Sequence, residues 1–307
     1  MKYKITRAVS GQQPSIELTY EEYSHILESK HKLVIFLGVE EKLDLLLQNY
    51  AEYESTLLDL ALHQMICRDW DWSSFRADIQ LVNRRLTNLL STARLYVDQI
   101  KHDLCVLYGS ESQVVIAIEG EFSKQYDASF GYRAMESIRN YIQHRSLVVH
   151  RMRYPSKLDH PKIPTSRVRF GIIPSLDTTE VEKDSNFKDV VLKELRSRGR
   201  YVPLTPLVRE YIEGLAHVHE VIRQITNEDA SESQATLESV ERRASAVCGR
   251  ELAGLSVVTE DDVGRYLEVE SIFSDIAGRR ESLLKRNCYL RALSNRYVSG
   301  EVDEGDA

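Results

Sequence analysis

The chain contains few of the residues that break helices. Its 307 residues include only 14 glycines and 7 prolines, and each of these residue types destabilises a helix interior. Apolar residues also recur every three or four positions through the longer segments, which is the spacing of one helix face. Between positions 40 and 66 such a stripe consists of Leu43, Leu46, Leu47, Tyr50, Leu57, Leu58, Ala61, Leu62 and Met65. We therefore expect a mainly α-helical fold.

Residues 1–40 are expected to form a short N-terminal extension. Residues 2–9 alternate between polar and apolar side chains, as a strand does. Thr19 followed three residues later by Glu22 is the pattern of a capping box, which predicts a short helix. Residues 33–37 fit either a strand or the beginning of the next helix, and Gly38 leaves both alternatives open.

The next segment, residues 41–155, is expected to form a helical domain. Helices are predicted over residues 40–66 and 75–108, separated by a turn at 69–74 in which Ser73 or Ser74 caps the second helix. Residues 112–122 fit a third helix, or a short strand at 114–118. A further helix, which carries the motif described below, is expected from about residue 128 and to end by Pro155.

Three prolines, Pro155, Pro161 and Pro164, mark a boundary after this domain. Residues 156–185 are predicted to be a linker with short strands, in which 167–173 forms a small β hairpin with 178–181 across Pro174 and Ser175. Residues 186–307 are expected to be an additional helical domain. Its helices are predicted at 187–198, 207–226, 233–249 and 263–298, followed by a frayed acidic tail at 301–307.

Composition favours a cytoplasmic protein without a metal or cofactor. Four widely spaced cysteines, Cys67, Cys105, Cys248 and Cys288, form no C-x2-C pair, and we expect reduced, mostly buried thiols. The longest apolar run, residues 33–39, is too short to span a bilayer. The chain does not open with a basic and then apolar leader, so we do not expect secretion. His217 and His219 lie on different helix faces and would be poor metal ligands. No phosphate-cradling loop, nucleophile elbow or H-E-x-x-H sequence is present.

One strongly basic segment stands out in this acidic protein. Residues 133–169 contain nine Lys or Arg and two acids, a balance of +7, while the whole chain carries −7. The remainder therefore carries −14. A local positive charge of this size indicates an anionic ligand, and RNA is the leading candidate.

The predicted motif helix places polar residues opposite an apolar face. At 100° per residue, Ala134, Met135, Ile138, Tyr141, Ile142, Val149 and Met152 share one side. Arg133, Glu136, Arg139, Asn140, Gln143 and His144 lie on the other. Asn140 and His144 are four residues apart and therefore adjacent, and the long side chain of Arg139 reaches toward them.

This combination of side chains suits cleavage of a phosphodiester. Histidine accepts and returns protons near neutral pH, arginine stabilises charge on phosphate oxygens, and an amide orients a hydroxyl or the imidazole. RNA supplies its own nucleophile, the 2′-hydroxyl beside the phosphate. The residues therefore predict metal-free cleavage that leaves a 2′,3′-cyclic phosphate. DNA, which lacks the hydroxyl, should resist.

The sequence Arg139-Asn140-x3-His144 resembles the R-[N/D/H]-x3-H signature of HEPN-domain proteins, and residues 83–99 are similar to the long helix that precedes the motif. The resemblance covers about residues 41–155. It implies a HEPN-like helical bundle and a metal-independent endoribonuclease in which Arg139 and His144 are catalytic and Asn140 supports them. It also implies a homodimer with a composite site, and a bacterial toxin or phage-defence component with an inhibitory or trigger partner.

Other residues of the basic segment are candidates for RNA binding, namely Arg133, Gln143, His150, Arg151 and Arg153. A second R-x4-H match, Arg145 to His150, is the poorer candidate, because Arg145 falls within the apolar arc. Two alternatives to catalysis stay open. The polar face could bind RNA without cutting it, or the protein could be a non-catalytic helical interaction protein in which Arg139 pairs with Glu136 and His144 packs at a contact.

Overall fold

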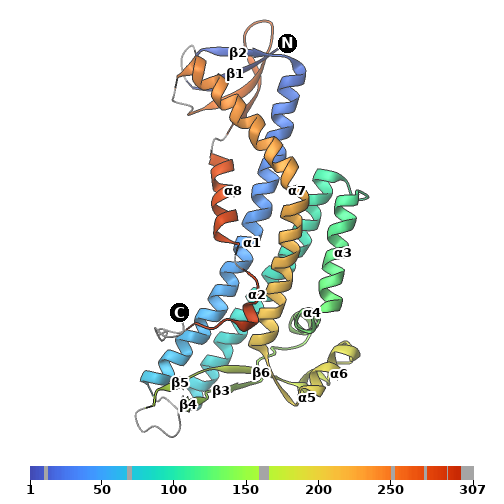
Figure 1. The fold of residues 1–307 in the computed structure, drawn as a ribbon, viewed down its shortest axis with the longest axis vertical. Coiled ribbons are helices and arrows are strands. Elements are labelled where there is room, and N and C mark those ends of the chain that lie inside the picture. The colour runs from blue at the N-terminus through green and yellow to red at the C-terminus, as the bar shows by residue number, and fades with distance from the viewer. Residues whose placement is uncertain are drawn as a thin grey trace. The chain divides into compact units, whose positions relative to one another are not determined.

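The computed structural model describes residues 1–9, 13–67, 71–158, 166–249, 253–272, 275–288 and 290–298. Over these residues the chain forms eight α-helices and three small sheets, which confirms a mainly α-helical fold (Figure 1). The boundary residues Pro161 and Pro164, the first part of the predicted 69–74 turn, and the tail 301–307 lie outside the described residues.

The chain divides into two compact units, each assembled from segments that are distant in sequence. The first unit consists of Met1–Asp44, His102–Val114 and Ile222–Cys288, and the second of Leu45–Lys101, Val115–Val221 and Tyr289–Ala307. The sequence instead predicted consecutive domains. The difference arises because three long helices, α1 (Tyr20–Ile66), α2 (Trp72–Tyr108) and α7 (Leu204–Cys248), each contribute residues to both units.

The first unit contains a four-stranded antiparallel sheet with the order β2-β1-β8-β9. The predicted N-terminal strand is confirmed as β1 (Lys2–Arg7), which pairs with β2 (Ser15–Leu18) and β8 (Leu255–Glu260). In Figure 1 these are the blue and orange strands. Buried Ile5 and Val257 belong to the core cluster beneath the sheet.

The predicted helix over residues 263–298 is wrong at both ends. Residues 266–271 form β9 (Tyr266–Ser271), the partner of β8, and the helix is the shorter α8 (Asp275–Arg286). Among the described residues after α8, only Leu293–Asn295 are helical, as a short 3-10 helix. The side chain of Asp261 accepts hydrogen bonds from the backbone N–H groups of Val263 and Arg265, at 2.9 and 2.8 Å. These bonds close a turn in which Gly264 has a φ of +87°, and the hairpin follows from that turn.

The capping box at the start of α1 is confirmed. The Thr19 hydroxyl accepts from the Glu22 N–H at 3.1 Å, and the Glu22 carboxylate accepts from the Thr19 N–H at 2.9 Å. The helix then continues for 47 residues. Residues 33–37 are therefore helical rather than a strand, and the two helices expected at 19 and at 40–66 are one.

In the second unit, α2 is followed by α3 (Gln113–Ala128) and α4 (Phe130–His144), so that residues 114–118 form a helix and not a strand. The cap of α2 is Asp71, whose carboxylate accepts from the Ser74 N–H at 3.0 Å. The prediction that Ser73 or Ser74 caps α2 is therefore wrong. Ser129 caps α4 by accepting from the Tyr132 N–H at 3.2 Å.

Helix α4 ends at His144, eleven positions before Pro155. Val149 and Met152, which the helical projection assigned to its apolar face, are buried but lie beyond the helix. The chain leaves the helix because buried Asn83 of α2 binds the backbone of this segment. Its Oδ1 accepts from the N–H groups of Val148 and Val149, at 3.2 and 2.9 Å, and its Nδ2 donates to the Val149 carbonyl at 3.3 Å.

The predicted hairpin between 167–173 and 178–181 is also wrong. Strand β5 (Val168–Phe170) pairs with β4 (Ser156–Leu158), while residues 178–181 form helix α5 (Thr178–Val181). Strand β6 (Ile173–Asp177) contains Pro174 and Ser175 and lies between β3 (Arg151–Arg153) and β7 (Tyr201–Pro203).

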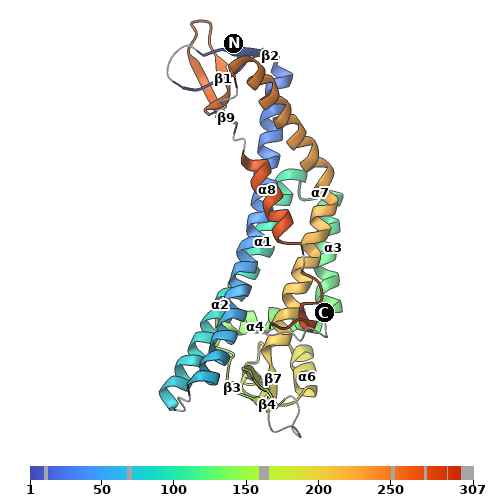
Figure 2. The same cartoon turned by 60° about the vertical axis from the view of Figure 1, so that its left-hand side comes forward.

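Helix α6 (Asp189–Ser197) packs on α4 near this sheet, in the region where Figure 2 labels β3, β4, β7 and α6. It confirms the helix predicted at 187–198. The helices expected at 207–226 and 233–249 are one continuous helix, α7.

Among the cysteine side chains that the structure describes, Cys67 and Cys105 are half-buried, Cys288 is exposed and all three are free thiols. The expectation of mostly buried thiols is therefore wrong for these three. The helices of the described ranges include none whose length and apolar character would let it cross a bilayer.

Replacing Asn83 should destabilise the protein. Asn83→Ala leaves two buried backbone N–H groups and one carbonyl without their side-chain partner, and we expect a loss of about 3 kcal/mol in the free energy of unfolding. Urea denaturation checks this, with Asn88→Ala, an exposed asparagine of the same helix, as the control that should stay within about 0.5 kcal/mol of the wild type. Equal stability of the two variants would contradict the proposed anchoring.

Candidate functional site

One face of α4 exposes a polar group of side chains, Arg139, Asn140, Gln143 and His144, which we call the motif cluster. Asn140, Gln143 and His144 are exposed, while Ala134, Met135, Ile138 and Tyr141 are buried on the opposite side. Since α4 extends through His144, Asn140 and His144 are neighbours on the exposed face. The two faces predicted for this part of the helix are therefore confirmed.

Arg139 is held in place by the side chains around it. Its Nη1 donates to Gln143 Oε1 at 3.0 Å and its Nη2 to Asn140 Oδ1 at 2.7 Å. Its Nε lies 3.9 Å from Glu136 Oε2, and this buried atom has no hydrogen-bond partner within the described part of the chain. With 14 % of its side chain exposed, the guanidinium is a fixed positive charge at the protein surface.

Glu136 connects this arginine to the protein core. The hydroxyl of Tyr211 on α7 donates to Glu136 Oε1 at 2.6 Å. Burial, together with the neighbouring Glu136 carboxylate, raises the pKa of Tyr211 well above its ordinary value. The tyrosine therefore stays a donor, and Glu136 stays positioned beside Arg139.

His144 is the last residue of α4 and is exposed. The described residues provide no hydrogen-bond partner for its ring, so both ring nitrogens are open to solvent or a ligand. The next arginine, Arg145, lies outside the helix and pairs with Asp184 at 2.8 Å, which separates the second R-x4-H match from the motif cluster.

Arg133 does not join the motif cluster. Its guanidinium forms an ion pair with Glu194 of α6 at 2.9 Å and donates to the carbonyls of Tyr126 and Asp127, at 3.2 and 2.5 Å. These contacts hold α4 against α6 and against the end of α3. Arg133 therefore stabilises the fold, and no local sequence pattern predicted this role.

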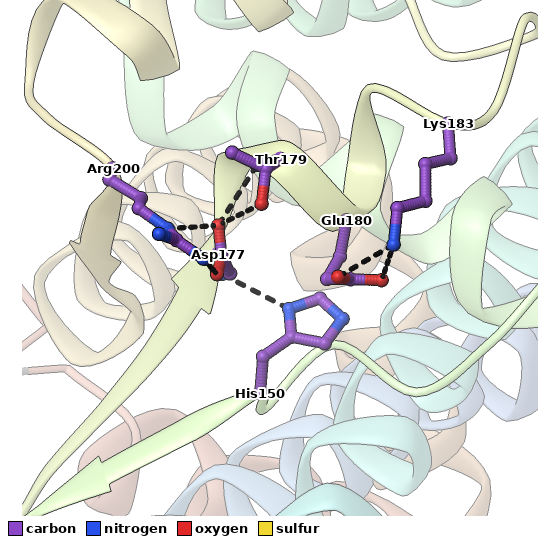
Figure 3. A network of polar contacts seen from close by, with 6 residues as sticks. All are labelled: His150, Asp177, Thr179, Glu180, Lys183 and Arg200. Carbon is purple, nitrogen blue, oxygen red and sulfur yellow. Dashed lines mark hydrogen bonds and ion pairs between the residues drawn. The ribbon is translucent and has the colours of Figure 1, made fainter.

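His150 belongs to a separate network, shown in Figure 3. Its Nδ1 accepts a hydrogen bond from the backbone N–H of Asp177 at 3.1 Å. The Asp177 carboxylate accepts from the Thr179 N–H at 3.0 Å and from Arg200 at 2.9 Å. These bonds, chiefly that from Arg200, lower the pKa of Asp177 to about 2. The network fixes the junction between β6 and α5.

The remaining predicted RNA-binding residues lie on β3. Arg151 is exposed, and its guanidinium lies 4.3 Å from the centre of the Tyr201 ring. Arg153 is exposed as well and borders a hollow beside the N-terminus of α2. Met152 between them is buried, so the strand presents both arginines on its outer face.

The sequence indicated one of the two residues that position the motif cluster. Glu136 precedes Arg139 by one helical turn, and their pairing, which the non-catalytic alternative expected, is present in the structure. Tyr211 was not predicted, because it lies 75 positions after Glu136 and no sequence signal connects it to α4. Among the residues that the structure describes, no group of three or more His, Cys, Asp or Glu side chains is placed to hold a metal ion.

The network around His150 predicts a loss of stability in mild acid. Burial lowers the pKa of His150 below 6.5, with Glu180 and Asp177 opposing this shift and Lys183 adding to it. The unfolded chain therefore takes up a proton near pH 6.5 before the folded protein does. Stability is full above this pH and decreases as the pH falls below it. Urea unfolding at pH 7.5 and 5.5 measures the difference, which should be smaller in His150→Gln. An unchanged difference in this variant would contradict the account.

A search for relatives among protein-family models, curated proteins and solved structures finds no match to this chain.

Proposed function

We propose that the protein is a metal-independent endoribonuclease of HEPN type, in which the helices around α4 form a HEPN-like bundle. The observation that supports this proposal is the motif cluster, where one helix face presents a fixed guanidinium, an amide and a histidine with no described partner. The residues match the motif by which the sequence resembles HEPN proteins. Asn140 and His144 are exposed, and 14 % of the Arg139 side chain is exposed.

In the proposed reaction, His144 takes the proton of the RNA 2′-hydroxyl, whose oxygen attacks the adjacent phosphorus. The bond from phosphorus to the 5′-oxygen breaks, and a protonated imidazole returns a proton to the leaving oxygen. The products are a 2′,3′-cyclic phosphate and a 5′-hydroxyl. Arg139 stabilises the charge on the phosphate oxygens, and Asn140 orients the hydroxyl or the imidazole.

The same proposal includes a homodimer and a phosphate-binding surface. Each chain contributes one motif cluster, and we propose that two clusters face each other across the dimer, so that one histidine acts as base and the other as acid. Arg151 and Arg153 are exposed on β3 and can bind neighbouring phosphates. Gln143 contributes an exposed amide. We leave Arg133 and His150 out of this surface, because their polar atoms are used within the protein.

A biological setting follows only from the same resemblance. We propose a bacterial toxin or phage-defence component that works in the cytoplasm and is controlled by an inhibitory or trigger partner.

A second candidate function, a non-catalytic interaction protein, is favoured by one observation. Arg139 already contacts three side chains of its own helix, Glu136, Asn140 and Gln143. In that case the motif cluster is a rigid polar surface that binds another protein. The two functions differ in whether RNA is cut or bound at all.

The cleavage test uses a mixed RNA pool with purified protein in EDTA. We expect the wild type to produce fragments with cyclic phosphate ends. His144→Ala should reduce the cleavage rate about 10²- to 10⁴-fold, since this is the usual contribution of a general acid or base. His102→Ala, which removes an exposed histidine of α2, is the matched control and should cleave at the wild-type rate.

Equal cleavage by wild type and His144→Ala would trace the activity to a contaminant or another site and reject the proposal. If the proteins bind RNA but none of them cleaves it, the result would support an RNA-binding protein without catalytic activity. In that outcome Arg139→Ala should weaken binding, while Arg84→Ala, which alters an exposed arginine of α2, should not.

A further inference from the structure

The second unit contains a hollow of about 490 Å³ between the end of α1, the first two turns of α2 and the residues of β3. Its volume falls in the range of sites that bind small molecules, about 300–1,000 Å³. None of the residues of the motif cluster lines it. The hollow is therefore separate from the motif cluster.

Aromatic rings form much of the hollow. Trp72 lines it with 74 % of the residue exposed, which is unusual for so large an apolar side chain. Phe75 and Tyr154 line it too, with ring centres 6.1 Å apart and planes inclined at 59°. The guanidinium of Arg76 lies 5.3 Å from the centre of the Trp72 ring. Open aromatic faces next to an arginine are the features that bind planar bases by stacking.

The polar atoms of the hollow are mainly acceptors. Asp78 accepts from the Tyr154 hydroxyl at 2.7 Å and Asp71 from the Ser74 N–H at 3.0 Å, so both carboxylates are oriented by the protein. Gln64 Oε1 is buried and has no hydrogen-bond partner among the described residues. A buried acceptor without a donor costs free energy, and a ligand N–H group would satisfy it.

Acceptors of this kind distinguish between bases. Guanine presents the N1–H and the N2 amino group side by side, adenine and cytosine each present one exocyclic amino group, and uracil presents a single ring N3–H and no amino group. A carboxylate can accept both guanine donors at once. The hollow therefore favours bases that carry amino groups, with guanine first.

The same hollow has a positively charged side chain that can bind a phosphate group. Arg153 lines it and is exposed, and an arginine binds phosphate oxygens with two parallel hydrogen bonds. The two carboxylates make the hollow unsuitable for a phosphate alone. A base with an attached phosphate satisfies the rings, the acceptors and the arginine together.

We propose that this hollow is a nucleobase pocket, in which an amino-bearing base, guanine above all, stacks on Trp72 while Arg153 binds its phosphate. The base belongs either to an RNA chain or to a free nucleotide. The inference deepens the proposed function by naming a base-recognition site, and it rests on that function only where the base is part of an RNA substrate.

Calorimetry with GMP and UMP tests the pocket, in EDTA and with His144→Ala protein so that cleavage cannot interfere. We expect GMP to bind at least tenfold more tightly than UMP. Trp72→Ala should weaken GMP binding by fivefold or more, and Trp72→Phe should stay within threefold of the parent because a ring is kept. Tyr297→Ala, which removes an aromatic residue that is 77 % exposed, should not change the affinity.

A uridine oligonucleotide with one central guanosine, compared with the all-uridine oligonucleotide, identifies the source of the base. Tighter binding of the guanosine oligonucleotide that depends on Trp72 assigns the pocket to RNA, while binding of GMP alone assigns it to a free nucleotide. If neither GMP nor the guanosine oligonucleotide binds in a way that depends on Trp72, the proposed pocket is wrong. The cleavage results are unaffected by that outcome. If the protein binds GMP but the wild type cuts no RNA, the nucleobase pocket is supported and the proposed ribonuclease activity is rejected.

Discussion

The carboxylate of Glu136 is the contact on which the geometry of the motif cluster depends. It accepts a 2.6 Å hydrogen bond from buried Tyr211 and lies 3.9 Å from the Nε of Arg139. A half-buried charge of this kind is costly without partners. Because the tyrosine fixes the carboxylate and the carboxylate faces the guanidinium, Arg139 is oriented before any ligand arrives. Asn140 and Gln143 complete that orientation at the surface, and preorganised charge is what stabilises a transition state.

Asn83 links this cluster to the proposed base pocket. Three hydrogen bonds of its side chain hold residues 148 and 149 against α2, and the chain then forms β3, with Arg151 and Arg153 exposed and Met152 buried. Tyr154 follows directly and bonds to Asp78 of the same helix. A single helix, α2, thus positions both the segment that leaves the motif helix and one wall of the hollow. The exposed arginines lie between these two features along the chain.

Local periodicity was enough to predict the faces of α4 and the capping box at Thr19 and Glu22, since both depend on residues within two turns of each other. The end of α4 was missed because the side chain that replaces its helical hydrogen bonds, Asn83, is about sixty positions away. Strand β9 was taken for part of a helix, because its side chains are almost all exposed and the strand forms only by pairing with β8, which in turn pairs with β1. The pairing of Arg133 with Glu194 likewise arises only in the folded protein.

In the proposed reaction the RNA 2′-hydroxyl is the nucleophile at the motif cluster. The most direct measurement compares two RNA oligonucleotides that differ by one 2′-O-methyl group at the nucleotide before a mapped cleavage point, incubated with the protein in EDTA. We expect the methyl group to abolish cutting at that linkage and to leave cutting elsewhere unchanged, since the blocked oxygen can no longer attack. Equal cutting of both oligonucleotides at that linkage would contradict it and indicate water as the nucleophile.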